Sequence, residues 1–88
     1  MLKKIAIYGI GIVGKLLIDK LCMANIDVEY IIDRKAIVHR GISTYSLANL
    51  PTKVDIIILS IFDYGKIAYE VEKATGAKVV PLEDILCN

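Results

Sequence analysis

Short apolar runs alternate along the chain with stretches in which apolar residues recur every three or four positions. The first run, Ile5–Tyr8, is apolar throughout and ends at Gly9, which is typical of a strand buried on both faces. From Gly11 onward apolar residues return at helical spacing until Asn25. A β-branched and aromatic run, Val28–Asp33, follows and closes on a carboxylate. These segments predict a strand, a helix and a second strand parallel to the first.

The rest of the chain continues this alternation. Ile42–Tyr45 predicts a short edge strand, and Ser46 is expected to cap a brief helix that runs to Leu50 and is stopped by Pro51. Ile56–Leu59 is the most apolar run in the chain and predicts a central parallel strand. The remaining expected elements are a helix capped by Asp63 and closed at Gly76, a strand over Ala77–Val80 and a helical turn over Leu82–Leu86.

Strands that alternate with helices indicate an α/β protein with an open parallel sheet and helices on both of its faces. We expect four to five strands, and the usual right-handed connections favour the order 3-2-1-4-5 with the first strand in the centre. The chain has 88 residues, of which 56% are hydrophobic and 24% charged, so residues 1–88 are expected to form one folded domain.

Charge and composition narrow the class of protein further. Eleven Lys and Arg against ten Asp and Glu give a net charge of +1, so nucleic acid is not an expected partner. No apolar run approaches the roughly 18 residues that a membrane span needs, and no signal-peptide pattern follows the N-terminus. We therefore expect a cytoplasmic protein with no membrane partner. Cys22 and Cys87 fit no metal-ligand spacing and His39 has no partner by spacing, so neither a metal site nor a catalytic residue is predicted.

A glycine pattern lies directly between the first strand and the first helix: Gly9-Ile10-Gly11-Ile12-Val13-Gly14. In such a pattern Gly9 permits a tight turn, Gly11 lets the phosphates of a ligand approach the backbone, and Gly14 lets the helix pack close to the sheet. The free amides of the first helical turn, at Ile12 and Val13, then face the phosphates. The pattern in this position predicts a nucleotide site.

Other candidate residues follow the expected strands. Asp33 lies about 20 residues after the glycine pattern, where a carboxylate accepts hydrogen bonds from a ribose diol. Arg34 and Lys35 are candidates for covering a nucleobase or meeting a phosphate, with an ordinary polar loop as the alternative. Lys15 is a candidate for reaching a phosphate, with a surface lysine as the alternative, and Ser60 is a candidate for a second-rank ligand contact. The alternative interpretation is that the glycines only shape a turn and that Asp33 is a solvated residue at the end of a strand.

Four blocks of sequence carry a resemblance to a known family. They are Ile7–Gly14, Tyr30–Asp33, Gly41–Tyr45 with Leu50 and Pro51, and Val54–Ile58. With them, the stretch 3–86 resembles the small N-terminal Rossmann-like domain of bacterial enzymes of nucleotide-sugar and surface-polysaccharide biosynthesis, notably the dehydratase/epimerase and sugar acyltransferase groups. The resemblance implies that the glycine turn and Asp33 hold NAD or a UDP-sugar. The catalytic domain that follows in those enzymes has no counterpart here, so catalysis by these residues alone is not expected.

Three functions are consistent with this sequence. The leading hypothesis is a nucleotide-binding module that is a domain or partner of a larger enzyme. The alternatives are a non-catalytic scaffold or dimerisation domain, and an NAD-dependent oxidoreductase or epimerase completed by another chain or domain. We also expect a homodimer or a part of a longer chain, because apolar residues near the ligand end would otherwise remain exposed. These residues are Ile10, Ile12, Ile61 and Phe62.

Overall fold

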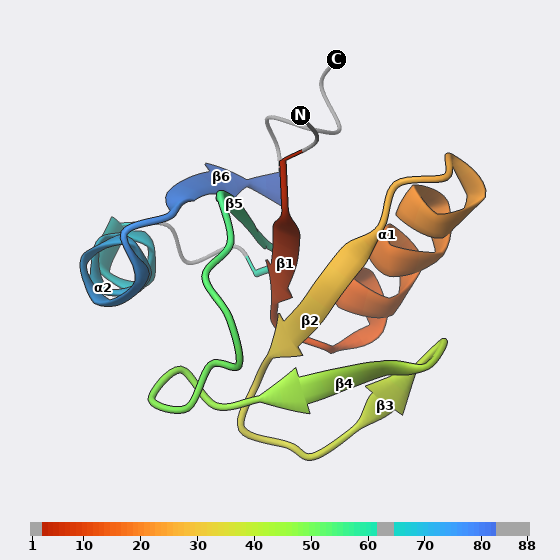
Figure 1. The fold of residues 1–88 in the computed structure, drawn as a ribbon, viewed down its shortest axis with the longest axis horizontal. Coiled ribbons are helices and arrows are strands. Elements are labelled where there is room, and N and C mark those ends of the chain that lie inside the picture. Colours follow the sequence, from red (N-terminus) through yellow and green to blue (C-terminus); the bar gives the residue numbers. More distant parts are fainter. Residues whose placement is uncertain (1–2, 62–64, 83–88) are drawn as a thin grey trace.

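The computed structural model describes residues 3–61 and 65–82 and has two helices and six strands among them (Figure 1). The elements in chain order are β1 (Ile5–Tyr8), α1 (Ile12–Met23), β2 (Val28–Ile32), β3 (Val38–His39), β4 (Ile42–Tyr45), β5 (Ile56–Leu59), α2 (Gly65–Thr75) and β6 (Lys78–Pro81). The α/β class expected from the alternating pattern is confirmed.

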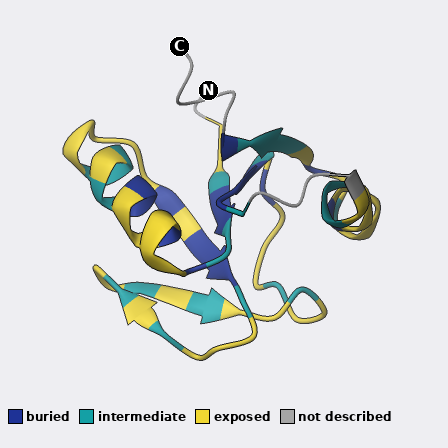
Figure 2. Cartoon of the chain, turned by 180° about the vertical axis from the view of Figure 1, so that it is seen from behind, coloured by how far each residue is buried: buried dark blue, intermediate teal, exposed yellow. Residues whose placement is uncertain are grey.

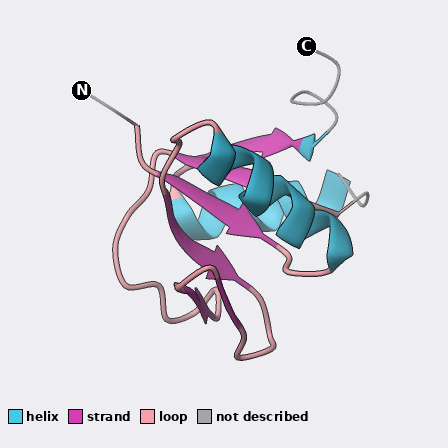
Figure 3. Ribbon diagram, turned by 90° about the vertical axis from the view of Figure 1, so that its right-hand side faces the viewer, coloured by secondary structure: helices cyan, strands magenta, loops and turns pink. Residues whose placement is uncertain are grey.

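The strands form one sheet in the order β3-β4-β2-β1-β5-β6. β1 lies inside the sheet and pairs in parallel with β2 and β5, and the pairs β2–β4 and β5–β6 are also parallel. Figure 3 shows the strands between the two helices, with α1 on one face of the sheet and α2 on the other. The expected helices on both faces are therefore present, and the carboxyl ends of β1, β2 and β5 meet at one edge.

The prediction of four to five parallel strands in the order 3-2-1-4-5 was wrong in strand count and in order. The difference arises at one edge, where β3 adds an antiparallel strand next to β4. The two residues between these strands, Arg40 and Gly41, both have positive φ, at 52° and 76°. This is the backbone that tight hairpins require, and Arg is not a residue that signals it.

Two expected helical segments differ from the structure or lie partly outside it. Ser46 and Asn49 form a single turn, with Asn49 N donating to Ser46 O at 3.0 Å, and no helix follows. Pro51 disfavours helical geometry at Leu50, which leaves too few residues to nucleate a helix. Asp63 and residues 83–86 lie outside the described residues, so the cap of α2 and the last helical turn stay predictions.

The core has one cluster on each face of the sheet, because successive strand residues point to opposite faces. The α1 side contains Ile7, Leu17, Ile18, Ile31 and Ile58, among others. The α2 side contains Ala6, Tyr30, Ile57, Val71 and Ala77, among others. Figure 2 shows this burial along the central strands and on the sheet-facing side of α1.

None of the helices in residues 3–61 and 65–82 combines the length and the apolar composition needed to cross a membrane.

Candidate functional site

The underside of the glycine turn is closed by the protein itself. Gly9 has a φ of +98°, and a Cβ built on it would lie 2.7 Å from Ser60 Oγ. A Cβ on Gly14 would lie 2.1 Å from the carbonyl oxygen of Gly9, which is backbone and cannot swing away. The fold therefore requires glycine at both positions, as the pattern predicts for the tight turn and the close helix packing.

Ser60 lies below this turn at the end of β5. Its side chain is buried, and its hydroxyl lies 2.7 Å from Gly9 O and 2.9 Å from Tyr8 O, the two carbonyls to which it can donate. Its own backbone N–H donates to Tyr8 O at 3.0 Å. These contacts use the hydroxyl inside the protein, so Ser60 supports the turn from beneath.

The outer side of the turn is open. A Cβ built on Gly11 would meet nothing within 4 Å, and its φ of −54° suits any residue. Gly11 is also the N-cap of α1 and offers no side-chain cap, so no described group accepts from the amides of Ile12 and Val13. Unlike the other two glycines, Gly11 has no reason in the described part of the chain to lack a side chain.

Asp33 connects the end of β2 to the turn. Its Oδ2 accepts a hydrogen bond from Ile10 N at 2.8 Å, and its Oδ1 accepts one from Lys35 N at 3.1 Å. Burial alone raises the pKa of Asp33, but backbone hydrogen bonds from Ile10, Lys35 and Arg34 outweigh it, so the pKa lies below the ordinary value of 3.8. A carboxylate offers about four lone-pair sites, so it retains acceptor capacity for a ribose diol.

Two cavities flank Asp33. The first, which we call the α1 cavity, has a volume of about 390 Å³. It is lined by Ile10, Gly11, Ile12, Lys15, Asp33, Lys35 and Ile37. The second, the α2 cavity, has a volume of about 510 Å³. It is lined by Tyr8, Gly9, Ile32, Asp33, Arg34, Ser46, Leu47, Ile61, Ile67 and Glu70. Both volumes suit part of a small ligand.

The structure brings most of the sequence-predicted residues to these cavities. The α1 cavity is lined by Lys15, the α2 cavity by Arg34, and both by Asp33. Val13 lies in the first turn of α1 and lines neither cavity. Lys35, a candidate from the sequence together with Arg34, lines the α1 cavity, whereas Glu70, which lines the α2 cavity, was not predicted from the sequence. Glu70 lies on α2 and matches no local sequence pattern.

Other chemistry-bearing residues lie away from this site. His39 Nε2 is 2.8 Å from Asp19 Oδ1, and Arg40 also pairs with that carboxylate, so this cluster ties the β3–β4 hairpin to α1. Cys22 is a free, half-buried thiol, and Cys87 lies outside the described residues. Within the described ranges, no group of three His, Cys, Asp or Glu side chains could hold a metal ion.

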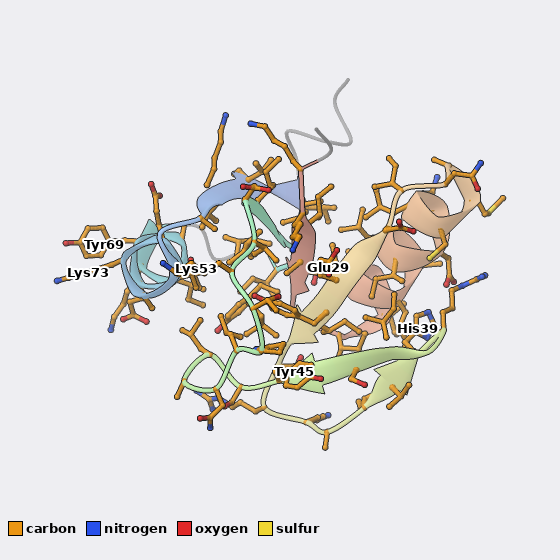
Figure 4. All side chains as sticks on the ribbon, viewed as in Figure 1. Glu29, His39, Tyr45, Lys53, Tyr69 and Lys73 are labelled. Carbon is orange, nitrogen blue, oxygen red and sulfur yellow. The ribbon has the colours of Figure 1, made fainter. Side chains whose placement is uncertain are left out.

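Tyr69 and Lys73 on α2 have the Tyr-x-x-x-Lys spacing of the catalytic pair in short-chain dehydrogenases. Tyr69 is 66% exposed, and Lys73 Nζ lies 5.8 Å from the centre of its ring. The two side chains point outward from α2 (Figure 4), and neither lines the cavities at Asp33. This pair therefore gives no support for catalysis at the glycine turn.

The outer face of α1 is apolar. Ile12 is 81%, Leu16 56% and Met23 79% exposed, on the side of the helix opposite the buried Leu17. The expectation that Ile10 is exposed was wrong, because its side chain is only 2% exposed and packs on the α1 side of the sheet. Phe62 lies outside the described residues.

Comparisons of the chain with models of protein families, with curated proteins and with solved structures found no match. The family resemblance and the ligands it implies therefore remain predictions, and the function must be argued from the geometry of the glycine turn.

Proposed function

We propose that the chain is a nucleotide-binding module for NAD(H) or a UDP-sugar. In this proposal it acts as a domain or partner of an enzyme of nucleotide-sugar or polysaccharide biosynthesis. The observation that carries the proposal is the open space in front of Gly11. Glycine at a helix N-cap with an ordinary φ is explained when a ligand needs the space that a side chain would fill.

The residues around Gly11 supply the interactions that phosphates require. The amides of Ile12 and Val13 begin α1 without an acceptor among the described residues, and the positive end of the helix dipole lies there. Asp33 has lone pairs left for ribose hydroxyls, and Arg34 lines the neighbouring cavity, where a guanidinium can cover a base.

The proposed role is binding rather than catalysis. If NAD binds, the cofactor supplies hydride transfer, and this chain contributes the turn and Asp33 that hold its phosphates and ribose. Ser46 lines the α2 cavity with Asp33 and Glu70, but among the described residues its hydroxyl is hydrogen-bonded to Asn49 and to neither carboxylate. In the alternative of an oxidoreductase or epimerase, another chain or domain would complete the site.

Calorimetric titration of the chain with NAD, a UDP-sugar and coenzyme A tests the proposal. We expect saturable binding of NAD or the UDP-sugar below millimolar concentration. Asp33→Asn is expected to weaken that binding roughly ten- to a hundredfold, because charge-assisted hydrogen bonds to the ribose are lost. Absence of binding by all three ligands at millimolar concentration would overturn the proposal.

A second candidate function is association between two copies of the chain, as a scaffold. The exposed side chains of Ile12, Leu16 and Met23 on the outer face of α1 favour it. Light scattering after size exclusion is expected to give a dimer mass for the unmodified chain and a monomer mass for Leu16→Lys. The control, Tyr69→Lys, changes a similarly exposed side chain on α2 and is expected to leave the dimer intact.

A further inference from the structure

The chain between β2 and β5 contributes little to the core. No residue between Ile32 and Val54 is buried, and the β3–β4 hairpin lies in this stretch. β4 is joined to β2 by two residue pairs, Ile31–Thr44 and Ile32–Tyr45, and β3 pairs with β4 alone. Segments with few buried side chains and few shared backbone hydrogen bonds are the first to open in native proteins. The hairpin is therefore weakly attached to the sheet.

The tip of the hairpin is held by α1. His39 Nε2 lies 2.8 Å from Asp19 Oδ1, and Arg40 Nε donates to the same oxygen. In Figure 4, His39 lies at the end of the hairpin next to α1. Hydrogen bonds from Arg40 and then from His39 lower the pKa of Asp19 below its ordinary value of 3.8, so this carboxylate is charged at neutral pH. One carboxylate on α1 therefore contacts two side chains of the hairpin tip.

The turn at the tip holds a residue that its backbone disfavours. Arg40 has a φ of 52° and precedes Gly41, which has a φ of 76°. Tight hairpin turns of this kind favour Asn before Gly, because Asn tolerates positive φ. Arg at this position weakens the turn, but its side chain reaches Asp19, 21 residues away in the sequence. The contact with α1 therefore explains a residue that the turn alone does not.

The hairpin also carries one wall of the α1 cavity. Lys35 and Ile37, which precede β3, line that cavity. The hydroxyl of Thr44 on β4 donates to the carbonyl oxygen of Ile37, so this wall is tied to the hairpin. Ile37 and Ile42 are half-buried and pack against the core on the α1 side of the sheet. A movement of the hairpin away from α1 therefore moves this wall and widens the cavity.

We propose that the β3–β4 hairpin is a flap that opens from α1 while the rest of the domain stays folded. The contact of Arg40 and His39 with Asp19 is its latch, and release of the latch opens the α1 cavity. This inference goes beyond the proposed function, because the flap and its latch follow from contacts within the chain and require no nucleotide.

Cys22 can report the opening of the flap. It follows Asp19 by three residues on α1, so the two side chains lie on the same side of the helix. The pKa of Arg40 is raised mainly by Asp19 and in smaller part by Cys22, which shows that Cys22 lies near the hairpin tip. Its thiol is free and half-buried, and it packs against the same core cluster as Ile37 and Ile42. We therefore expect the thiol to react faster when the flap is open.

The test measures the rate at which iodoacetamide, an uncharged reagent, labels Cys22. The 88-residue chain carries Cys87→Ser, which leaves Cys22 as its one thiol, and each rate is divided by the rate for the same chain unfolded in urea. At low urea the rate is expected to rise much less steeply than global unfolding does, because opening of a flap exposes little surface. Circular dichroism gives the Tm of each variant.

The decisive variant is Arg40→Asn. Loss of a positive charge near Cys22 disfavours the reactive thiolate and would by itself slow labelling, whereas release of the latch accelerates it. We expect labelling at least about twofold faster and a Tm nearly unchanged, since Asn suits the turn.

Asp19→Ala is expected to accelerate labelling about three- to tenfold, because it removes the acceptor of both tip side chains. Ala favours helix, so the change does not weaken α1 itself. The matched control is Asp27→Asn, at an exposed acid beyond the end of the same helix, and it is expected to leave the rate unchanged.

Three results would overturn the flap. They are labelling of Arg40→Asn at or below the rate of the unmodified latch, equal acceleration by Asp27→Asn and Asp19→Ala, and a urea dependence as steep as that of global unfolding. None of these measurements uses a nucleotide. Failure of the flap therefore leaves the proposed function standing, and failure of nucleotide binding leaves the flap standing.

Discussion

On the underside of the turn between β1 and α1, the space that side chains on Gly9 and Gly14 would need is filled by Ser60 and by the Gly9 carbonyl. On the outer side, a side chain on Gly11 would meet nothing within 4 Å. The three positions of this motif therefore hold glycine for two different physical reasons. Two are required by the packing of the protein, and for the third, Gly11, we propose access to a ligand as the reason. A glycine pattern alone does not separate these reasons, but the surroundings of each absent Cβ do.

The largest effect is expected from Gly14→Ala. The new Cβ would be 2.1 Å from Gly9 O, so α1 must move away from the turn. We expect a loss of about 3 kcal/mol or more in unfolding free energy and a drop in Tm of more than about 10 °C. Thermal unfolding followed by circular dichroism measures this, with Gly11→Ala as the matched change in open space. Equal Tm values for the two variants would contradict the packing account of Gly14.

Gly9→Ala is expected to cost about 1–3 kcal/mol, from its φ of +98° and from the 2.7 Å approach of the new Cβ to Ser60 Oγ. Ser60→Ala alone is expected to cost about 1 kcal/mol, because it removes the hydrogen bond to Gly9 O. The double variant should cost less than the sum of the two, since removing the hydroxyl relieves the clash. Additive values in denaturant unfolding would show that the two residues do not meet.

Asp33→Asn is expected to destabilise the chain by about 1 kcal/mol at neutral pH, because the amide cannot accept from both Ile10 N and Lys35 N as the carboxylate does. The pKa of Asp33 is lowered in the folded protein, so its stabilisation is present above the ordinary value of 3.8 and is lost as the pH falls below it. The Tm difference between the two proteins should therefore narrow in acid.

Asp27→Asn provides the control for that comparison, because Asp27 is exposed. Its Tm is expected to follow that of the unmodified chain over the whole pH range. A difference for Asp33→Asn that persists unchanged after the pH has fallen through the lowered pKa of Asp33 would mean that the charge of Asp33 does not hold the turn.

Much of the fold can be predicted from the local sequence pattern. The part that cannot be predicted depends on tertiary contacts. β1 and β5 are continuous apolar runs and β2 is interrupted only by the exposed Glu29, because these strands are covered on both faces, so the sequence predicts them well. β3 has only two residues and shows no pattern. It exists because the hairpin after it turns at Arg40 and is tied to α1 through Asp19, and both are tertiary effects.

The same distinction applies to the candidate site. The glycine pattern and Asp33 could be placed from the sequence, because the carboxyl ends of parallel strands meet at one edge. The position of Ser60 beneath Gly9 could not, since it depends on the register in which Tyr8 pairs with Leu59. The contribution of Glu70 depends on how α2 packs over the sheet, and no spacing in the sequence reports that.

Gly11→Asn tests the central claim most directly, because it separates folding from access. Asn is among the best N-cap residues, and its side chain would accept from the free amides at the start of α1, so we expect Tm to stay the same or rise slightly. The same side chain would fill the space in front of the turn, so affinity for NAD or a UDP-sugar is expected to fall at least about tenfold. Calorimetric titration measures that affinity. If the variant is as stable as the unmodified chain and still binds nucleotide with full affinity, the account is contradicted, since the outer side of the turn would then not be the place where a ligand binds.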